Sequence, residues 1–195
     1  MSIKVRSLGT VSSAARGILI TGGTNATPIV ATVTALHRMK NGDRIAIAGV
    51  TTLTAMNGEW EVGSVGATSA TLLGSAGNGA YGGTAVVAAL MDRTPHIAKH
   101  SAMFMQGDVG LAAVFVGTMV IEYADSVDAT QFYYTNSSGV ATAGFADALQ
   151  SGEIAIPAQT VVGGGMLGLE VTLRRYMAMR CSAYTSGSAV GFLAA

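Results

Sequence analysis

The chain has 195 residues, no net formal charge at pH 7 and only 11% charged residues, against roughly 25% in average globular domains. Half of its residues are hydrophobic and 26 are glycine, so it has enough apolar volume for one large or two small domains. Lysine and arginine are scattered and form no basic stripe, which argues against nucleic acid as a partner. Such low charge indicates a surface that neighbouring subunits bury, although a genome that favours Ala and Gly would produce the same bias.

Membrane insertion and secretion are not expected either. The longest plainly apolar run, residues 109–121, is shorter than the roughly 20 residues of a membrane-spanning helix. The N-terminal residues lack the apolar core of a signal peptide. Cys181 is the only cysteine, which rules out an internal disulfide framework and fits assembly in a reducing cytoplasm.

Residues 1–17 are predicted to be an extended arm. Ile3, Val5 and Leu8 are separated by polar or charged residues, as in a strand that is too short to stand alone. The pattern is typical of an arm that crosses a neighbouring subunit, of a frayed terminus, or of the first strand of a barrel. The sequence leaves these alternatives open.

Residues 18–90 are predicted to form a small β-barrel. Asn41-Gly42 and Asn57-Gly58 suit tight hairpin turns, because both residue types tolerate positive φ. Trp60, the only tryptophan, is predicted to fill the barrel core. The candidate strands are residues 30–34, 44–50, 60–65, 70–73 and 84–88, with a glycine-rich loop at 74–83.

The same stretch carries a family resemblance. The run ITGGTNATPIV, then His37, then NGDRI, then Met56-Asn57-Gly58 before an aromatic strand, resembles a β-barrel module that recurs in virion proteins of tailed bacteriophages. That module is similar to the half-domain named for the first catalytic cysteine of ubiquitin-activating enzymes. The resemblance implies a virion scaffold or attachment module and brings no catalytic residue with it, since residues 18–89 contain no cysteine.

Residues 91–99 are predicted to be a linker, and residues 100–195 a β-sandwich. Asp92, Arg93 and Pro95 follow a long uncharged stretch, and proline interrupts any regular element that crosses it. Beyond the linker, strand-like segments recur at the spacing of a sandwich. They are residues 109–123, 131–135, 153–157, 167–173, 175–182 and 189–193, while residues 141–150 would form either a short helix or an irregular loop.

The second half carries a further resemblance. The run RYMAMRCSAYTSGSAVGF, residues 175–192, resembles the closing hairpin of jelly-roll β-sandwiches in phage proteins. The run VIEYADSVD, residues 120–128, is similar to an earlier strand and turn of the same group. The expected fold class is therefore all-β: a small barrel followed by a jelly-roll-like sandwich, with an extended N-terminal arm.

His96 and His100 stand at the i, i+4 spacing of zinc ligands on a helix. The zinc-protease pattern also needs an acid directly after the first histidine, and Ile97 occupies that place. Only His37 remains as a further imidazole. A solvated linker is the better interpretation, and no metal ion is expected.

Two stretches, residues 77–82 and 163–168, match the G-x-G-x-x-G pattern of dinucleotide-binding folds. The pattern works where it opens a helix whose N-terminus holds a pyrophosphate. Both matches run into strand-like sequence instead. No nucleotide and no other cofactor is therefore expected.

Glu122, Asp125 and Asp128 form a local group of carboxylates. Paired carboxylates serve glycoside hydrolysis or bind calcium, but this spacing matches no calcium-loop motif, and a polar turn at a strand end is the default. Cys181 stands in an apparent strand, as a buried inert thiol usually does, and no nucleophile elbow is present. No catalytic, metal-binding or cofactor-binding residue is predicted.

These features favour a non-enzymatic structural protein of a phage virion. The expected role is a capsid decoration or cement protein that contacts the major capsid protein and other copies of itself, a trimer being one form. The alternative is a tail, neck or fibre component involved in attachment, with a sandwich that binds a host glycan. A third class, a carbohydrate-active enzyme, would need the three carboxylates to share a cleft. The expected location is the virion, after assembly in the host cytoplasm.

Overall fold

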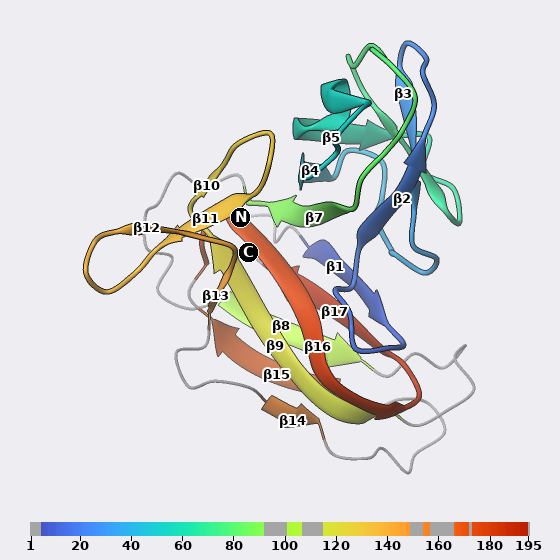
Figure 1. Ribbon diagram of the computed structural model, residues 1–195. Coiled ribbons are helices and arrows are strands. Elements are labelled where there is room, and N and C mark those ends of the chain that lie inside the picture. Colours follow the sequence, from blue (N-terminus) through green and yellow to red (C-terminus); the bar gives the residue numbers. More distant parts are fainter. Residues whose placement is uncertain are drawn as a thin grey trace.

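The computed structural model describes residues 5–91, 101–106, 115–148, 154–156, 166–171 and 173–194. In these residues the regular structure consists of strands β1 to β17 and one 3₁₀-helix, η1 (Thr54–Met56). The strands form a closed barrel, a two-sheet sandwich and a small three-stranded sheet (Figure 1). The expected fold class, all-β with a barrel followed by a sandwich, is confirmed.

The barrel closes because β4 pairs with β5 on one side and with β7 on the other. The order around it is β7-β2-β3-β6-β5-β4, so no strand edge is left open. Its strands are β2 (Leu19–Gly23), β3 (Ile29–Val33), β4 (Arg44–Ala48), β5 (Gly58–Gly63), β6 (Ser69–Leu72) and β7 (Ala85–Leu90). All except β2 were predicted, to within about two residues at each end.

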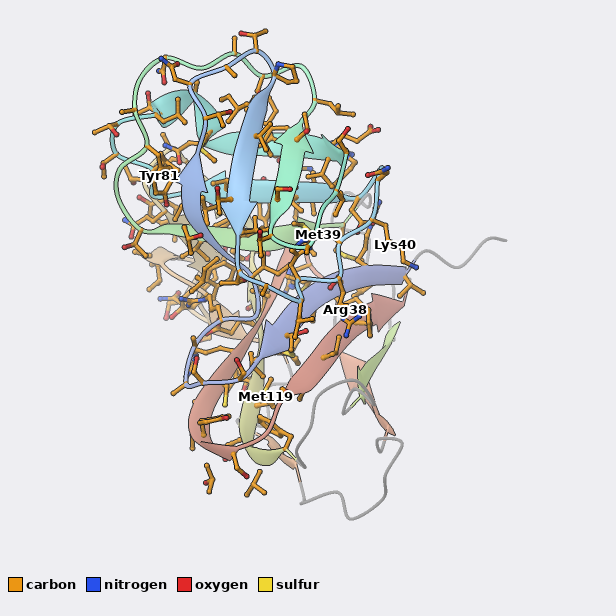
Figure 2. All side chains as sticks on the ribbon, turned by 90° about the vertical axis from the view of Figure 1, so that its right-hand side faces the viewer. Arg38, Met39, Lys40, Tyr81 and Met119 are labelled. Atoms are coloured by element: carbon orange, nitrogen blue, oxygen red, sulfur yellow. The ribbon has the colours of Figure 1, made fainter. Side chains whose placement is uncertain are left out.

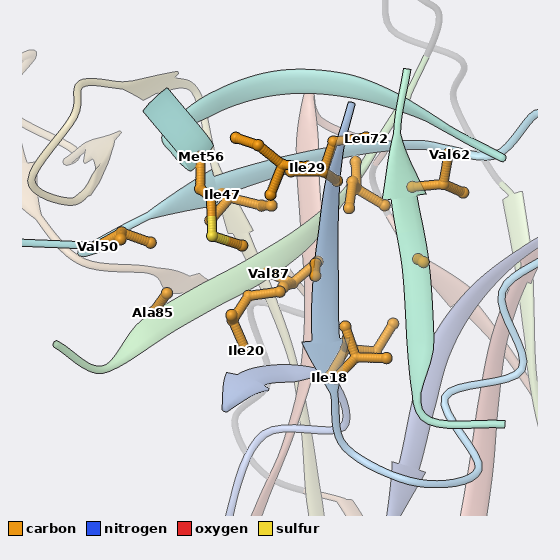
Figure 3. Packing of buried hydrophobic residues seen from close by; sticks show 14 of the residues in the cluster. Ile18, Ile20, Ile29, Ile47, Val50, Met56, Val62, Leu72, Ala85 and Val87 are labelled. Atoms are coloured by element: carbon orange, nitrogen blue, oxygen red, sulfur yellow. The ribbon is translucent and has the colours of Figure 1, made fainter. Parts of the chain in front are cut away.

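Alternation along the strands fills the barrel core. Ile45 and Ile47 of β4 belong to the buried cluster inside the barrel, whereas Ala46 and Ala48 belong to a different cluster outside it. Trp60 was predicted to fill the barrel core; it is half-buried and packs against the barrel cluster, and its indole N–H donates to the Met56 carbonyl at 2.8 Å. Figure 3 labels the main core residues: Ile18, Ile20, Ile29, Ile47, Val50, Met56, Val62, Leu72, Ala85 and Val87.

The predicted two-residue hairpins were wrong at both Asn-Gly pairs. Asn41-Gly42 is a turn, whereas Asn57 is the extended residue that ends η1 and Gly58 begins β5. The connection from β4 to β5 contains η1, and the Asn57 amide closes it by accepting from the Val50 N–H at 3.0 Å and donating to the Val50 carbonyl at 2.8 Å. Asn41-Gly42 follows β3, which does not pair with β4. Gly42, with φ of 84°, donates its N–H to the carbonyl of Val62 in β5. Strands that are neighbours in the sequence are not always neighbours in the barrel.

The sandwich consists of two sheets that face each other over one core. The first has the order β1-β17-β8-β15, and in the second β9 lies between β16 and the short strands β13 and β14. Leu8 and Leu193 of the first sheet share a buried cluster with Met119, Ile121 and Met179 of the second. The strands are β1 (Val5–Val11), β8 (Ser101–Gln106), β9 (Val116–Ala124), β13 (Ala146–Asp147), β14 (Ile154–Ile156), β15 (Met166–Val171), β16 (Tyr176–Ser186) and β17 (Ala189–Ala194).

Of the predicted arm, residues 5–11 form the extended strand β1, which pairs within this chain. Strand β1 runs antiparallel to β17, so it belongs to the sandwich and not to the barrel. It also contacts the barrel loop that precedes β4: the Ser7 hydroxyl donates to the His37 carbonyl at 2.6 Å, and the Arg6 guanidinium lies 3.0 Å from the Asp43 carboxylate. Of the predicted linker, residues 91–99, only Met91 is described. It is buried in the sandwich core and donates its N–H to the Arg175 carbonyl at 2.8 Å, so the linker prediction is wrong at this residue; residues 92–99 lie outside the described residues.

The third sheet consists of β10 (Ser126–Val127), β11 (Phe132–Thr135) and β12 (Ala141–Ala143). The predicted strand at residues 131–135 is thus confirmed. A helix within residues 141–150 was one of two predicted forms and is wrong for residues 141–147, which hold β12 and β13. Small residues there gain their backbone hydrogen bonds from neighbouring strands, which a local pattern does not reveal.

Strand β7 joins the barrel to the sandwich. Its start pairs with β2 and β4, whereas Ala89 and Leu90 at its end pair with β16. A buried cluster fills the junction, and we call it the apolar joint: Ala46, Ala48, Ala88, Leu90, Ala124, Phe132 and Tyr176. Because β4 and β7 bury residues on both faces, both strands are uninterrupted apolar runs after Arg44.

Candidate functional site

Beside the apolar joint, four side chains form a polar joint between the barrel and the sandwich: Arg44 of β4, Glu59 of β5, Arg175 and Tyr176. Arg175 donates to Glu59 Oε1 from Nη2 at 2.6 Å and from Nε at 3.2 Å. The Tyr176 hydroxyl donates to the same oxygen at 2.6 Å. The Arg44 guanidinium lies 3.8 Å from Glu59 Oε2. One carboxylate therefore accepts hydrogen bonds from the sandwich while it pairs with a barrel cation.

These contacts set the protonation states of the polar joint. Burial alone would raise the pKa of Glu59, but hydrogen bonds from Tyr176 and Arg175, together with the charges of Arg175 and Arg44, lower it overall. Burial, and then the hydrogen bond to Glu59, raise the pKa of Tyr176. Glu59 is thus ionised and Tyr176 protonated near neutral pH. A general acid needs a carboxyl pKa raised toward 7, so this geometry suits holding two parts of the fold together rather than proton transfer.

The sequence did not predict the polar joint. Glu59 and Arg175 stand far apart in the chain, and no local spacing connects them. The sequence offered only an indirect indication of this contact: isolated charges in otherwise neutral, strand-like segments require partners when they are partly buried. Which partner each one finds depends on the pairing of β7 with β16.

The structure separates the three carboxylates that the sequence grouped. Glu122 on β9 is buried, with 7% of its side chain exposed, and lies between two arginines. Arg16 Nε is 3.0 Å from Oε2, and Arg180 Nε is 2.9 Å from Oε1. The Arg16 guanidinium also lies 4.9 Å from the centre of the Phe145 ring. This ion triad ties the segment after β1 to β9 and β16.

Asp125 and Asp128 have partners of their own. Asp125 lies 3.6 Å from the Arg174 guanidinium and accepts from the Thr135 N–H at 3.0 Å. Asp128 Oδ1 accepts from the Thr130 hydroxyl at 2.6 Å and from the Thr130 N–H at 2.7 Å. These bonds, the hydroxyl first, lower the pKa of Asp128. The polar-turn interpretation is confirmed for Asp128, and each of the three carboxylates serves a separate local structure.

His37 is buried in the barrel loop that contacts β1. Its Nδ1 accepts from the Met39 N–H at 3.1 Å, so Nε2 carries the proton and donates to the Gly66 carbonyl at 2.9 Å. Burial lowers the pKa of His37. The neutral ring therefore holds the loop together, and neither nitrogen is left for a metal ion.

Cys181 on β16 is buried, as predicted. It is 2% exposed and its thiol donates to the Ala183 carbonyl at 3.2 Å. A thiol that is buried among apolar neighbours is poorly nucleophilic. Cys181 therefore packs the sandwich core.

The first glycine pattern, residues 77–82, allows close packing of the loop before β7. A side chain at Gly77 would place its Cβ 2.4 Å from the Asn25 side chain, and Gly79 donates its N–H to the same Asn25 oxygen at 3.2 Å. The loop leads into β7 and opens no helix. The second pattern lies partly outside the described residues, and Met166 onward forms β15.

His96 and His100 lie outside the described residues. Within the parts that are described, no three His, Cys, Asp or Glu side chains form a group that could hold a metal ion. Nor does any helix there have the length and apolar character to span a membrane.

Comparisons with known proteins identify no family. No protein-family model matches the chain, and neither a curated protein nor a solved structure gives a significant match. The likeness to phage modules rests on the residue motifs alone.

Proposed function

We propose that this protein is a non-enzymatic structural component of a tailed-phage virion, namely a capsid decoration or cement protein that stabilises the assembled head. The observation that carries the proposal is that charged side chains pair within the fold, while many exposed residues are neutral. The described ion pairs tie β1 to the barrel, the barrel to the sandwich, and β9 to its neighbours. Many of the exposed residues are neutral Ala, Gly, Ser, Thr and Asn.

A surface of this kind suits contact with other subunits. Charged residues are depleted at the centre of protein interfaces, because each buried charge must be desolvated. The joined barrel and sandwich provide a preorganised body, so little conformational entropy is lost when it binds. A protein that binds only the assembled shell adds its binding free energy to the stability of that shell.

The first test is binding to heads. Purified protein is mixed with expanded capsids that lack tails and is then sedimented, with unexpanded procapsids as the matched control. We expect the protein to pellet with expanded capsids and to raise the temperature at which they release DNA. Failure to bind expanded capsids would refute the decoration role.

The alternative is a tail, neck or fibre component, which the barrel resemblance favours. Immunogold electron microscopy of intact particles, with antibody against residues 100–195, separates the two. Gold over the whole head, in many copies, supports decoration. Gold confined to the neck or tail supports the appendage role.

A further inference from the structure

The sheet β10-β11-β12 extends from the body of the protein and ends in an exposed strand. Phe132 of β11 is 2% exposed and anchors the sheet in the apolar joint. Strand β12 lies at the edge of this sheet (Figure 1). Its residues Ala141 and Ala143 are exposed. Val140, directly before it, is 58% exposed. The sheet is therefore held firmly at one end and open to solvent at the other.

The outer edge of β12 presents backbone groups that pair with no strand among the described residues. Asn136 donates its N–H to the Val140 carbonyl at 3.0 Å, and Gly144 donates its N–H to the Phe132 carbonyl of β11 at 2.6 Å. Bonding alternates along an antiparallel ladder, so the backbone groups of Ala141 and Ala143 point away from β11. No described strand pairs with that side.

Apart from its length of three residues, which itself limits pairing, this edge lacks the protection that exposed edges normally carry. Natural proteins guard such strands with charges, proline or a bulge. No charged residue and no proline stands between Asp128 and Asp147, and β11 pairs with β12 without a register shift. The edge is thus chemically suited to accept another strand.

The sequence of β12, Ala141-Thr142-Ala143, reads the same in both directions. When two copies of this strand run antiparallel about a two-fold axis at Thr142, Ala141 of each copy faces Ala143 of the other and Thr142 faces Thr142, so only small uncharged side chains meet. Ala141 would exchange both hydrogen bonds with Ala143 of the second copy. The two Thr142 residues would form a non-hydrogen-bonded pair with Cα atoms about 4.5 Å apart, and Thr–Thr is a favourable cross-strand pair.

We propose that β12 is a self-association edge, at which two copies of this protein join their three-stranded sheets into one six-stranded sheet centred on Thr142. The paired segment is short, so a single contact is weak, and copies arranged side by side on a larger assembly would strengthen it by avidity. The inference depends only on this chain and holds whether or not the protein binds a capsid.

The test is a cysteine placed on the proposed two-fold axis. In the Thr142→Cys variant of the full chain, mild oxidation should link two copies through residue 142, because the Cα separation suits a disulfide. The matched control, Ser138→Cys, lies at the hairpin tip and is exposed, whereas Thr142 is half-buried. The control thiol is therefore the more accessible of the two, but its two copies would lie at opposite ends of the paired strands. The buried native thiol does not compete. Equal cross-linking of both variants, or none at residue 142, would overturn the proposal.

A charge exchange provides the second arm. Thr142→Lys and Thr142→Glu should each be monomeric by light scattering at concentrations where the wild type is dimeric, because like charges would meet on the axis. An equimolar mixture of the two should restore the dimer. A wild-type protein that is monomeric up to millimolar concentration, or a mixture that stays monomeric, would refute the edge contact. Circular dichroism of each variant checks that the fold is intact.

Discussion

Truncation of Phe132 to alanine tests whether the apolar joint couples the barrel to the sandwich. Phe132 is 2% exposed, and its ring centre lies 4.8 Å from that of Phe145 and 5.6 Å from that of Tyr176. Removing a buried phenylalanine costs about 3–5 kcal/mol, through lost transfer energy and the cavity left behind. For a chain of this size, 1 kcal/mol shifts Tm by roughly 2–4 °C. We therefore expect Tm to fall by about 6–20 °C.

The assay uses Trp60 as a reporter of the barrel, since it is the only tryptophan and lies against the barrel core. Far-UV circular dichroism reports all strands together. In the wild type the two melting curves should coincide, because the joint makes unfolding cooperative; in the variant they should separate. The control is Val140→Ala, at a residue 58% exposed, which should change the unfolding free energy by less than about 0.5 kcal/mol. If Tm fell by less than about 2 °C in the variant, the proposed coupling between barrel and sandwich would be refuted. Wild-type fluorescence and circular dichroism curves that already separate would refute it too.

Three further predictions concern single contacts. Burial holds the pKa of His37 below 6.5, so as pH drops the unfolded chain protonates this histidine before the folded chain does, and wild-type stability should fall below pH 6.5. In urea titrations above and below that pH, His37→Gln should show a weaker pH dependence. An unchanged dependence would contradict the buried, neutral state of His37. Tyr176→Phe removes the hydroxyl donor of the polar joint and should lower the free energy of unfolding in urea by about 1–2 kcal/mol. The control Tyr184→Phe, at an exposed tyrosine, should lower it by less than about 0.5 kcal/mol. Equal decreases would argue that the polar joint does not stabilise the fold. Gly9→Ala and Gly74→Ala both place alanine at positive φ, at about 1–2 kcal/mol each. Only at Gly9 would the new Cβ meet a backbone oxygen, at 2.3 Å, so Gly9→Ala should lower Tm much further, and similar Tm values would contradict that close approach.

The candidate sites illustrate how far local patterns reach. Sequence spacing placed Glu122, Asp125 and Asp128 in one group, yet the structure gives Glu122 two arginines from distant segments and gives Asp128 its own turn. Asp128 could be interpreted locally because its partners are two and three residues away. The partners of Glu122 could not, since Arg16 and Arg180 come from the two ends of the chain.

What the sequence determined by itself was the kind of element and the face of each residue. Alternation from Arg44 onward is enough to predict a strand with one side in the barrel, and five of the six barrel strands followed from such local patterns. Strand β2 was not predicted, because Gly22 and Gly23 weaken the strand pattern in the sequence.

The tertiary structure alone decided which strands are neighbours. The period-two pattern states which face of a strand is buried but not against what. Strand β1 therefore joins β17 from the opposite end of the chain, and β7 extends from the barrel into the sandwich to meet β16. The polar joint exists only because of that last pairing, since it brings Arg175 to Glu59. Partner choice follows from packing and hydrogen bonding between distant segments, and for this reason only the folded chain shows it.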